Sequence, residues 1–271
     1  MNSHRPAQAN AIARTAAALL GVGMLAGCTS GGGSAAPQAA SAPATRATPT
    51  ASAPALSASR LFSAALAAVR AGGSVHVDIT SDAAGGSVAF SDDATASGGR
   101  QVITFDGTGH ATILLIRGVD YVLADAEGLQ GFFQVPLAQA EQAAGRWISL
   151  RPGEKLGTNT YDDVTAGITL SSVATELQVG SPLSKTAPAT VAGQPVIGVQ
   201  APVPASDGLH GARMVLYVTD NPALRPVRYE LVGGGSTTNE ISFSRWGERL
   251  DLTAPANAVP ASSLSAGSVT V

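Results

Sequence analysis

The sequence holds a single cysteine, Cys28, in 271 residues, so no disulfide can form within the chain. Its fold must therefore be stabilised by a hydrophobic core alone. Charged residues make up only 13% of the chain, and 16 basic residues stand against 19 acidic ones. This balance provides neither the basic surface that nucleic acid requires nor a polybasic patch that would attract anionic lipid. We therefore exclude nucleic acid as a partner.

Enzyme motifs are also missing. The stretch Gly85–Ala89 lacks the final glycine of a nucleophile elbow, and the glycine runs lack the strand-then-helix context of a phosphate-binding loop. His76 and Asp78 share one face of a predicted strand, but no third metal ligand accompanies them. We therefore predict no catalytic residue, no metal site and no cofactor, and an envelope hydrolase is the disfavoured hypothesis.

Two further groups of residues receive a structural interpretation. Asp92-Asp93 and Asp162-Asp163 are adjacent carboxylates that point apart on an extended chain, and we predict that they are ordinary loop acids. Trp147 and Trp246 could be ligand platforms, but buried tryptophan in a sheet domain usually belongs to the core.

The N-terminal segment has the build of an export signal. Arg5 and Arg14 supply a positive region, Ala16–Leu25 an apolar region, and Ala26-Gly27 the small residues that precede a cleavage site. Only thirteen residues separate Arg14 from Cys28, fewer than the ~20 that a membrane-spanning helix needs. We predict a signal peptide at residues 1–27 that is cleaved.

The four residues Leu25-Ala26-Gly27-Cys28 resemble the lipobox of bacterial lipoproteins at every position. The resemblance implies thioether attachment of diacylglycerol to Cys28, cleavage after Gly27 and acylation of the new terminus, typically with palmitate. The alternative is that Cys28 is an ordinary small residue of a plain secretory signal. With two or more acyl chains the anchor would be stable, and the protein would sit on the extracytoplasmic face of the cell membrane.

After the cysteine, residues 28–55 are mostly Ala, Ser, Thr, Pro and Gly with one charge, Arg46. Such a tract has too little apolar surface to offset the entropy of folding, so we predict a disordered tether. Without Arg5 and Arg14 the mature chain holds 14 basic and 19 acidic residues, a net charge of −5.

Residues 56–260 are predicted to fold as one domain, followed by a frayed tail at 261–271. Apolar residues recur with helical spacing over 61–69 and over 170–177, and 136–144 could form a shorter helix. Alternating residues separated by turns about every ten positions indicate antiparallel strands. The predicted strands are 75–79, 87–91, 101–106, 111–117, 120–124, 195–200, 213–219, 227–231 and 240–246, with an extended stretch at 250–255.

The order of these features resembles the LppX/LprG family of envelope lipoproteins, relatives of the LolA-type lipoprotein carriers. The resemblance is carried by Gly118–Val122, Trp147-Ile148, Val191–Gly193, Arg225–Arg228 and Phe243–Glu248, with Pro255 beyond. It implies an α+β fold, in which two or three helices lie on the concave face of a curved antiparallel sheet, a U-shaped half-barrel. Between the two layers, members of the family hold acyl chains of envelope lipids or lipoproteins.

Two functions remain open. The first is a lipoprotein that binds or transfers a lipid or glycolipid in a cavity between sheet and helices. We expect this cavity to be smaller than in lipid-carrying members of the family, because aromatics are only 4% of the chain. The second is a non-enzymatic envelope interaction module with a filled core. The residues predicted to line the cavity are Phe105, Ile113, Leu115, Leu170, Val173, Leu177, Met214 and Leu216.

Overall fold

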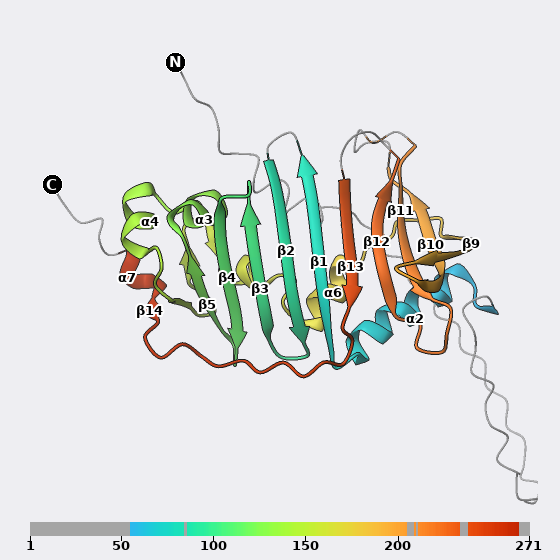
Figure 1. Cartoon of the computed structure of the whole chain (residues 1–271), viewed down its shortest axis with the longest axis horizontal. Coiled ribbons are helices and arrows are strands. Elements are labelled where there is room, and N and C mark those ends of the chain that lie inside the picture. The colour runs from blue at the N-terminus through green and yellow to red at the C-terminus, as the bar shows by residue number, and fades with distance from the viewer. Residues whose placement is uncertain (1–54, 84–85, 205–208, 210, 234–237, 266–271) are drawn as a thin grey trace, which may run out of the picture.

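A computed structural model describes residues 55–83, 86–204, 209, 211–233 and 238–265. Its main element is an open twelve-stranded sheet with the order β14-β6-β5-β4-β3-β2-β1-β13-β12-β11-β10-β9. Every pairing is antiparallel except that of β14 with β6. Figure 1 shows the sheet face on, with α3 and α6 behind it. The predicted α+β fold with a curved antiparallel sheet is confirmed.

Most strands form hairpins with their neighbours in the sequence. The strands of the main sheet are β1 (Ser74–Ala83), β2 (Gly86–Thr95), β3 (Gly99–Phe105), β4 (Gly109–Ile116), β5 (Val119–Ala124), β6 (Ile148–Leu150), β9 (Ser184–Val191), β10 (Gln194–Pro202), β11 (Arg213–Thr219), β12 (Pro226–Val232), β13 (Thr238–Ser244) and β14 (Val259–Pro260). A separate two-stranded ribbon consists of β7 (Lys155–Leu156) and β8 (Asn159–Thr160).

The described helices are more numerous than the predicted two or three, but most have one or two turns. They are α2 (Ala58–Ala71), α3 (Ala126–Gly131), α4 (Leu137–Ala143), α5 (Tyr161–Thr165), α6 (Leu170–Glu176) and α7 (Ala261–Ser265). Helix α2 is capped by Ser57, whose side chain accepts a hydrogen bond from the backbone N–H of Arg60. Its residues Leu61, Ala65 and Val69 lie one turn apart and are buried, as the helical periodicity predicts.

The first strand of the domain, β1, meets β13 from near the end of the domain in the middle of the sheet. Strand β1 pairs with β2 on one side and with β13 on the other, so Val77 lies beside Asp92 and Phe243. From β13 the chain then runs as an extended segment along one end of the sheet to β14 at its far edge (Figure 1). The backbone N–H of Val259 donates a 2.8 Å hydrogen bond to the carbonyl of Trp147 there.

Some boundaries differ from the predictions. Helix α7 forms at 261–265 and Ala261 is buried, which corrects the tail predicted from residue 261. The stretch 250–255 belongs to no strand. Strand β9 was not predicted, because it is the edge of the sheet and its mostly exposed side chains do not alternate between apolar and polar. Pro188 within it is tolerated since an edge strand pairs on one side only.

Candidate functional site

The space between the sheet and the helices is filled by two hydrophobic clusters. The α2 half joins α2 and α6 to residues of β1 and β10–β13, with Ala94 of β2. The α3 half joins α3, α4, α5 and α7 to residues of β2–β6, and it includes Phe133, which follows α3, and Ile168, which follows α5. Both clusters lie on the same face of one sheet, and β2 contributes to each.

The predicted lining residues all lie at this interface, but they are divided between the two halves. Leu170, Val173, Leu177 and Leu216 belong to the α2 half, and Met214 packs against it. Ile113 and Leu115 belong to the α3 half, with Phe105 packed against that cluster. The structure therefore does not bring the eight residues together around one centre. Six of them are 4% exposed or less.

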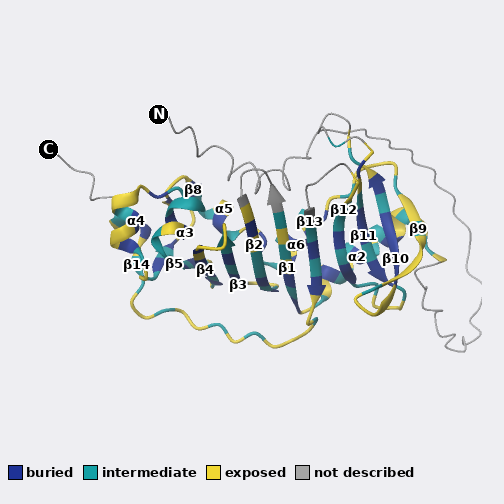
Figure 2. Ribbon diagram, turned by 45° about the horizontal axis from the view of Figure 1, so that its top comes forward, coloured by how far each residue is buried: buried dark blue, intermediate teal, exposed yellow. Residues whose placement is uncertain are grey.

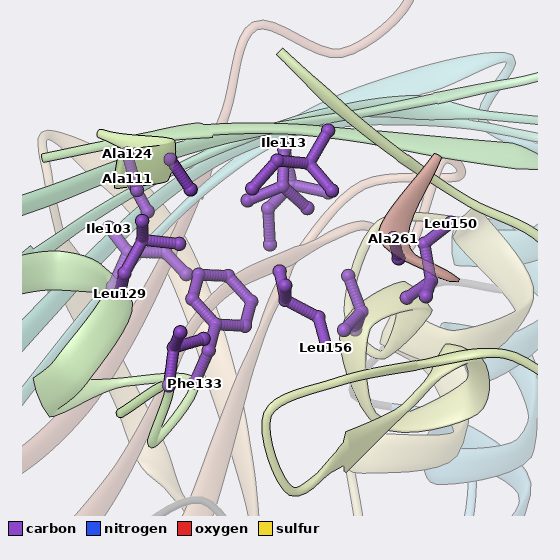
Figure 3. Packing of buried hydrophobic residues seen from close by; sticks show 14 of the residues in the cluster. Ile103, Ala111, Ile113, Ala124, Leu129, Phe133, Leu150, Leu156 and Ala261 are labelled. Atoms are coloured by element: carbon purple, nitrogen blue, oxygen red, sulfur yellow. The ribbon is translucent and has the colours of Figure 1, made fainter. Parts of the chain in front are cut away.

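The α3 half contains the largest fully buried side chain, that of Phe133. Figure 3 shows Ile103, Phe133 and Leu129 close together, with Ile113 extending from the sheet toward the helix side. Phe132 contacts Phe133 edge to face at a centroid distance of 4.9 Å, an arrangement that aromatic pairs favour. Helix α3 lies so close to β4 that a Cβ on Gly128 would stand 2.4 Å from the His110 carbonyl oxygen.

A buried carboxyl group separates the two clusters. The side chains of Val88, Asp92 and Ala94 lie on the same face of β2, and Asp92 is 1% exposed. Its Oδ2 accepts a 3.2 Å hydrogen bond from the Gln101 amide, which is directly opposite on β3. Its Oδ1 has no hydrogen-bond partner. Burial raises the pKa of Asp92 well above its usual value, and the Glu176 carboxylate adds to this rise.

Glu176 approaches the same point from α6. A Cβ added to Gly167 would lie 3.5 Å from Glu176 Oε1, from Asp92 Oδ2 and from the Gln101 amide nitrogen. The two carboxyl oxygens are therefore no more than about 7 Å apart, twice that 3.5 Å distance. Burial raises the pKa of Glu176 to about 7. Gly167 has φ +79°, a conformation that an L-amino acid with a side chain rarely adopts.

A third acid is buried beneath α5. Asp120 of β5 is fully buried, and its Oδ2 accepts a 2.8 Å hydrogen bond from the hydroxyl of Thr165. Its Oδ1 has no partner. Burial raises the pKa of Asp120 to about 7, although the hydrogen bond from Thr165 opposes the rise. All three acids are thus held where the neutral form is favoured.

Sequence reasoning missed these acids, although a signal for two of them exists. Asp92 continues the alternation of Val88 and Phe90, and Asp120 alternates with Val122. The prediction that Asp92-Asp93 are loop acids is wrong, because β2 extends to Thr95 and only Asp93 faces outward. Asp162-Asp163 also differ from the prediction. They form the first turn of α5, where Asp163 completes a capping box with Thr160.

His76 belongs to a charged cluster on the outer face of the sheet. Its Nε2 lies 3.2 Å from Asp78, and its Nδ1 lies 2.7 Å from Asp93. Arg245 contacts both His76 and Asp93. Sequence reasoning found His76 and Asp78 but not Asp93, which the β1–β2 register places directly opposite His76. Among the described residues, no group of acids, histidines and cysteines could hold a metal ion.

A pocket of about 520 Å³ lies at the β9 edge of the sheet. It is lined by Pro182 and Leu183, the start of β9, the end of β10, and Arg213. None of the eight predicted lining residues borders it. The edge also adjoins the start of the domain, where Lys185 Nζ donates a 2.8 Å hydrogen bond to the carbonyl of Leu56.

The predicted signal peptide, Cys28 and nearly all of the tether lie outside the described residues. Within the described part of the chain, no helix is long and apolar enough to cross a membrane.

No protein-family model matches the chain, and the search among curated proteins gives no relative. Solved structures do match. LprF from Mycobacterium bovis is 17% identical, with a TM-score of 0.45 over 74% of this chain and 97% of its own. The lipoprotein LppX from Mycobacterium tuberculosis is 14% identical, with a TM-score of 0.45 over 72% and 99%. An uncharacterised protein from Thermus thermophilus follows at 11% identity, with a TM-score of 0.37 over 75% and 97%. LppX, one of the two proteins for which the family is named, is thus among the solved structures that this chain resembles.

Proposed function

We propose that this protein is an exported lipoprotein that is anchored through Cys28 and binds acyl chains between its sheet and its helices. One observation carries the proposal. A twelve-stranded open sheet presents one apolar face, and short separate helices cover that face rather than a second sheet. Separate helices can move apart more readily than a continuous layer. Apolar surface that becomes buried against a ligand then contributes roughly 25 cal/mol per Å² to the free energy of binding.

The predicted lining residues support a site at this interface. Val173 and Leu177 of the α6 region and Leu216 of β11 lie together in the α2 half. Ile113 and Leu115 occupy the same face of the sheet in the α3 half. A bound acyl chain would replace side-chain contacts in one or both clusters, so binding requires the helices to shift from their positions here.

The second candidate is an envelope interaction module with a filled core. It is favoured by the near-complete burial of the same residues, with Ile113 and Leu216 at 0% exposure. In that case the contact surface would be sought at the edge strand β9, whose outer side pairs with no strand in the described part of the chain.

The experiment that separates the two uses the Cys28→Ala protein, expressed in a high-GC Gram-positive host and purified without detergent. Native mass spectrometry then detects any lipid that copurifies. Discrete adducts are expected for this protein and for a Val232→Trp control, because Val232 is 44% exposed at the end of β12. They should be lost in Val173→Trp, whose indole would fill the interface. A clean unliganded mass across several lipid extracts would contradict lipid binding and leave the interaction module.

Anchoring is tested separately with the full chain. We expect labelled palmitate to be incorporated into the protein and lost in Cys28→Ala, which should move from the membrane fraction to the soluble fraction. Unchanged membrane association of Cys28→Ala would contradict anchoring through this residue.

A further inference from the structure

Residues 161–176, here termed the cover, form a short unit that lies on the helix side of the sheet. The cover consists of α5, a turn that contains Gly167, and α6. Five of its apolar side chains, those of Val164, Ile168, Leu170, Val173 and Ala174, are buried in the two hydrophobic clusters. It also meets the sheet at three further points. Thr165 donates to Asp120 of β5, Gly167 approaches Asp92 and Gln101, and Thr169 forms a single bridge with Thr95 of β2. Each end of the cover is a separate capped helix, so the unit can move without unfolding internally.

The cover encloses three carboxyl groups without balancing positive charge. Asp92 is paired only with Gln101, and Asp120 only with Thr165. The side-chain carboxyl group of Glu176 has no hydrogen-bond partner among the described residues, and no described lysine or arginine forms an ion pair with any of the three acids.

The remaining groups near these acids increase the cost of ionising them. Asp78 and Asp93 act on Asp92 through the sheet from its outer face. On the cover itself, Glu176 faces Asp92, and the Tyr161 ring lies near Asp120 and Asp162. Burial of a carboxylate without a charged partner is unfavourable, so closure of the cover favours the neutral form of each acid, including the half-buried Glu176.

We propose that the cover closes onto the sheet when Asp92, Asp120 and Glu176 are protonated and leaves it when they ionise. The pH of the envelope then controls access to the apolar face between the α2 half and the α3 half. The opening itself does not depend on the proposed function; only its purpose, the admission of an acyl chain, rests on it. Gly167 lies in the turn that joins α5 to α6 within the cover, where its positive φ is available to glycine at little cost.

The direction of the effect follows from the raised pKa values. Glu176 has a pKa of about 7 in the closed form and a value near 4.5 when it is exposed. The closed form binds the proton of Glu176 more tightly than the open form does. The stabilisation of the closed form is therefore complete below the pKa of the exposed group and is lost as pH rises through about 7. One such group alone changes the opening equilibrium by about tenfold or more between pH 5.5 and pH 8.0.

The test is hydrogen–deuterium exchange with mass spectrometry on the Cys28→Ala protein at pH 5.5 and pH 8.0, corrected for the intrinsic exchange rate at each pH. Protection of amides 161–176 is expected to fall at least about tenfold at pH 8.0, whereas protection of α3 stays constant. Equal protection of the cover at both pH values would overturn the proposal. A parallel loss of protection in α3 would also overturn it, since it would indicate global unfolding.

Two variants assign the effect to the acids. Glu176→Gln and Asp92→Asn keep the shape of the side chains but cannot ionise, so each should reduce the pH-dependent loss of protection by at least about threefold. The matched control is Glu141→Gln, because Glu141 is an exposed glutamate on α4. An unchanged pH response in both variants, or the same reduction in the control, would overturn the assignment. The series on the Cys28→Ala protein with its acids intact decides the proposal even where a variant does not fold.

Lipid binding is scored in the same samples, so the two proposals can fail separately. Cover opening without lipid adducts at either pH would contradict the proposed function and leave the pH-dependent cover. Adducts at both pH values with a constantly protected cover would contradict the cover and leave lipid binding.

Discussion

The α2 half and the α3 half close the same face of one sheet in different ways. In the α2 half a single fourteen-residue helix spans several strands, and α6 beside it lies near the buried carboxyl group of Asp92. In the α3 half two helices of six and seven residues are pressed against the strands, with backbone approaching backbone at Gly128. Close backbone packing fixes the position of α3. Helix α6 is held by its buried Leu170, Val173 and Ala174, and ionisation of the acid beneath it would weaken that contact. Figure 2 shows buried residues along the strands of both halves, so exposure alone does not distinguish them.

The largest loss of stability is expected from Phe133→Ala in the α3 half. Phe133 is fully buried, and removing its ring leaves a cavity that costs about 3–5 kcal/mol. Urea denaturation followed by the fluorescence of Trp147, which lies beside β6 in this half, measures the change. Leu137→Ala is the control, because Leu137 is 56% exposed and should change stability little. A loss for Phe133→Ala no larger than that of the control would show that this half is not tightly packed.

A somewhat smaller loss is expected from Leu61→Ala in the α2 half. Leu61 is fully buried on α2, and leucine truncations of this kind cost about 2–5 kcal/mol. The lower half of that range is expected because the separate helices α2 and α6 can settle into the space. Trp246, stacked on Phe243, reports this half. If Leu61→Ala costs more than Phe133→Ala, the contrast between the halves is wrong.

Gly128→Ala tests the close approach in the α3 half directly. The added methyl group would meet the His110 carbonyl oxygen at 2.4 Å, so helix and strand must separate, at a cost of about 1–3 kcal/mol. The midpoint of thermal unfolding measures it. An unchanged midpoint would mean that α3 can move freely from β4, in conflict with a fixed position.

An effect of similar size is expected from pH at Asp120. Burial raises the pKa of Asp120 to about 7, so the stability that its neutral form contributes at low pH is lost as pH rises through that value. Between pH 5 and pH 8 the wild type should lose about 1–3 kcal/mol more than Asp120→Asn. Asp251→Asn, an exposed aspartate, should behave as the wild type does. Equal pH slopes for Asp120→Asn and wild type would contradict a buried, neutral Asp120.

The sequence allowed the regular parts of both halves to be predicted. The spacing of Leu61, Ala65 and Val69 predicted α2, and the alternation of residues predicted β1, β3–β5 and β10–β13 within a few positions. These elements carry their apolar pattern locally, so no knowledge of the fold is needed. The short helices α3, α5 and α7 were missed, because one or two turns show no periodicity and are held by caps and tertiary contacts.

The site was less accessible to sequence reasoning for a different reason. The eight lining residues could be placed on the inner face, but their division into two clusters depends on which strands are neighbours. The meeting of Glu176 with Asp92 depends on the position of α6, which no local pattern fixes. The position of Asp93 beside His76 follows from the β1–β2 register alone, so it could have been predicted from the sequence.

The pairing of β1 with β13 has a consequence for how the molecule is made. The middle of the sheet joins residues near position 77 to residues near position 243, and the strand at its far edge includes Val259. Contacts so distant along the chain raise the contact order and slow folding. A chain that emerges from its N-terminus first could form the hairpins of β1–β5 early, but it could not unite its two halves until residues 238–260 had followed. The sheet can therefore be completed only when almost the entire length of the domain is available to fold.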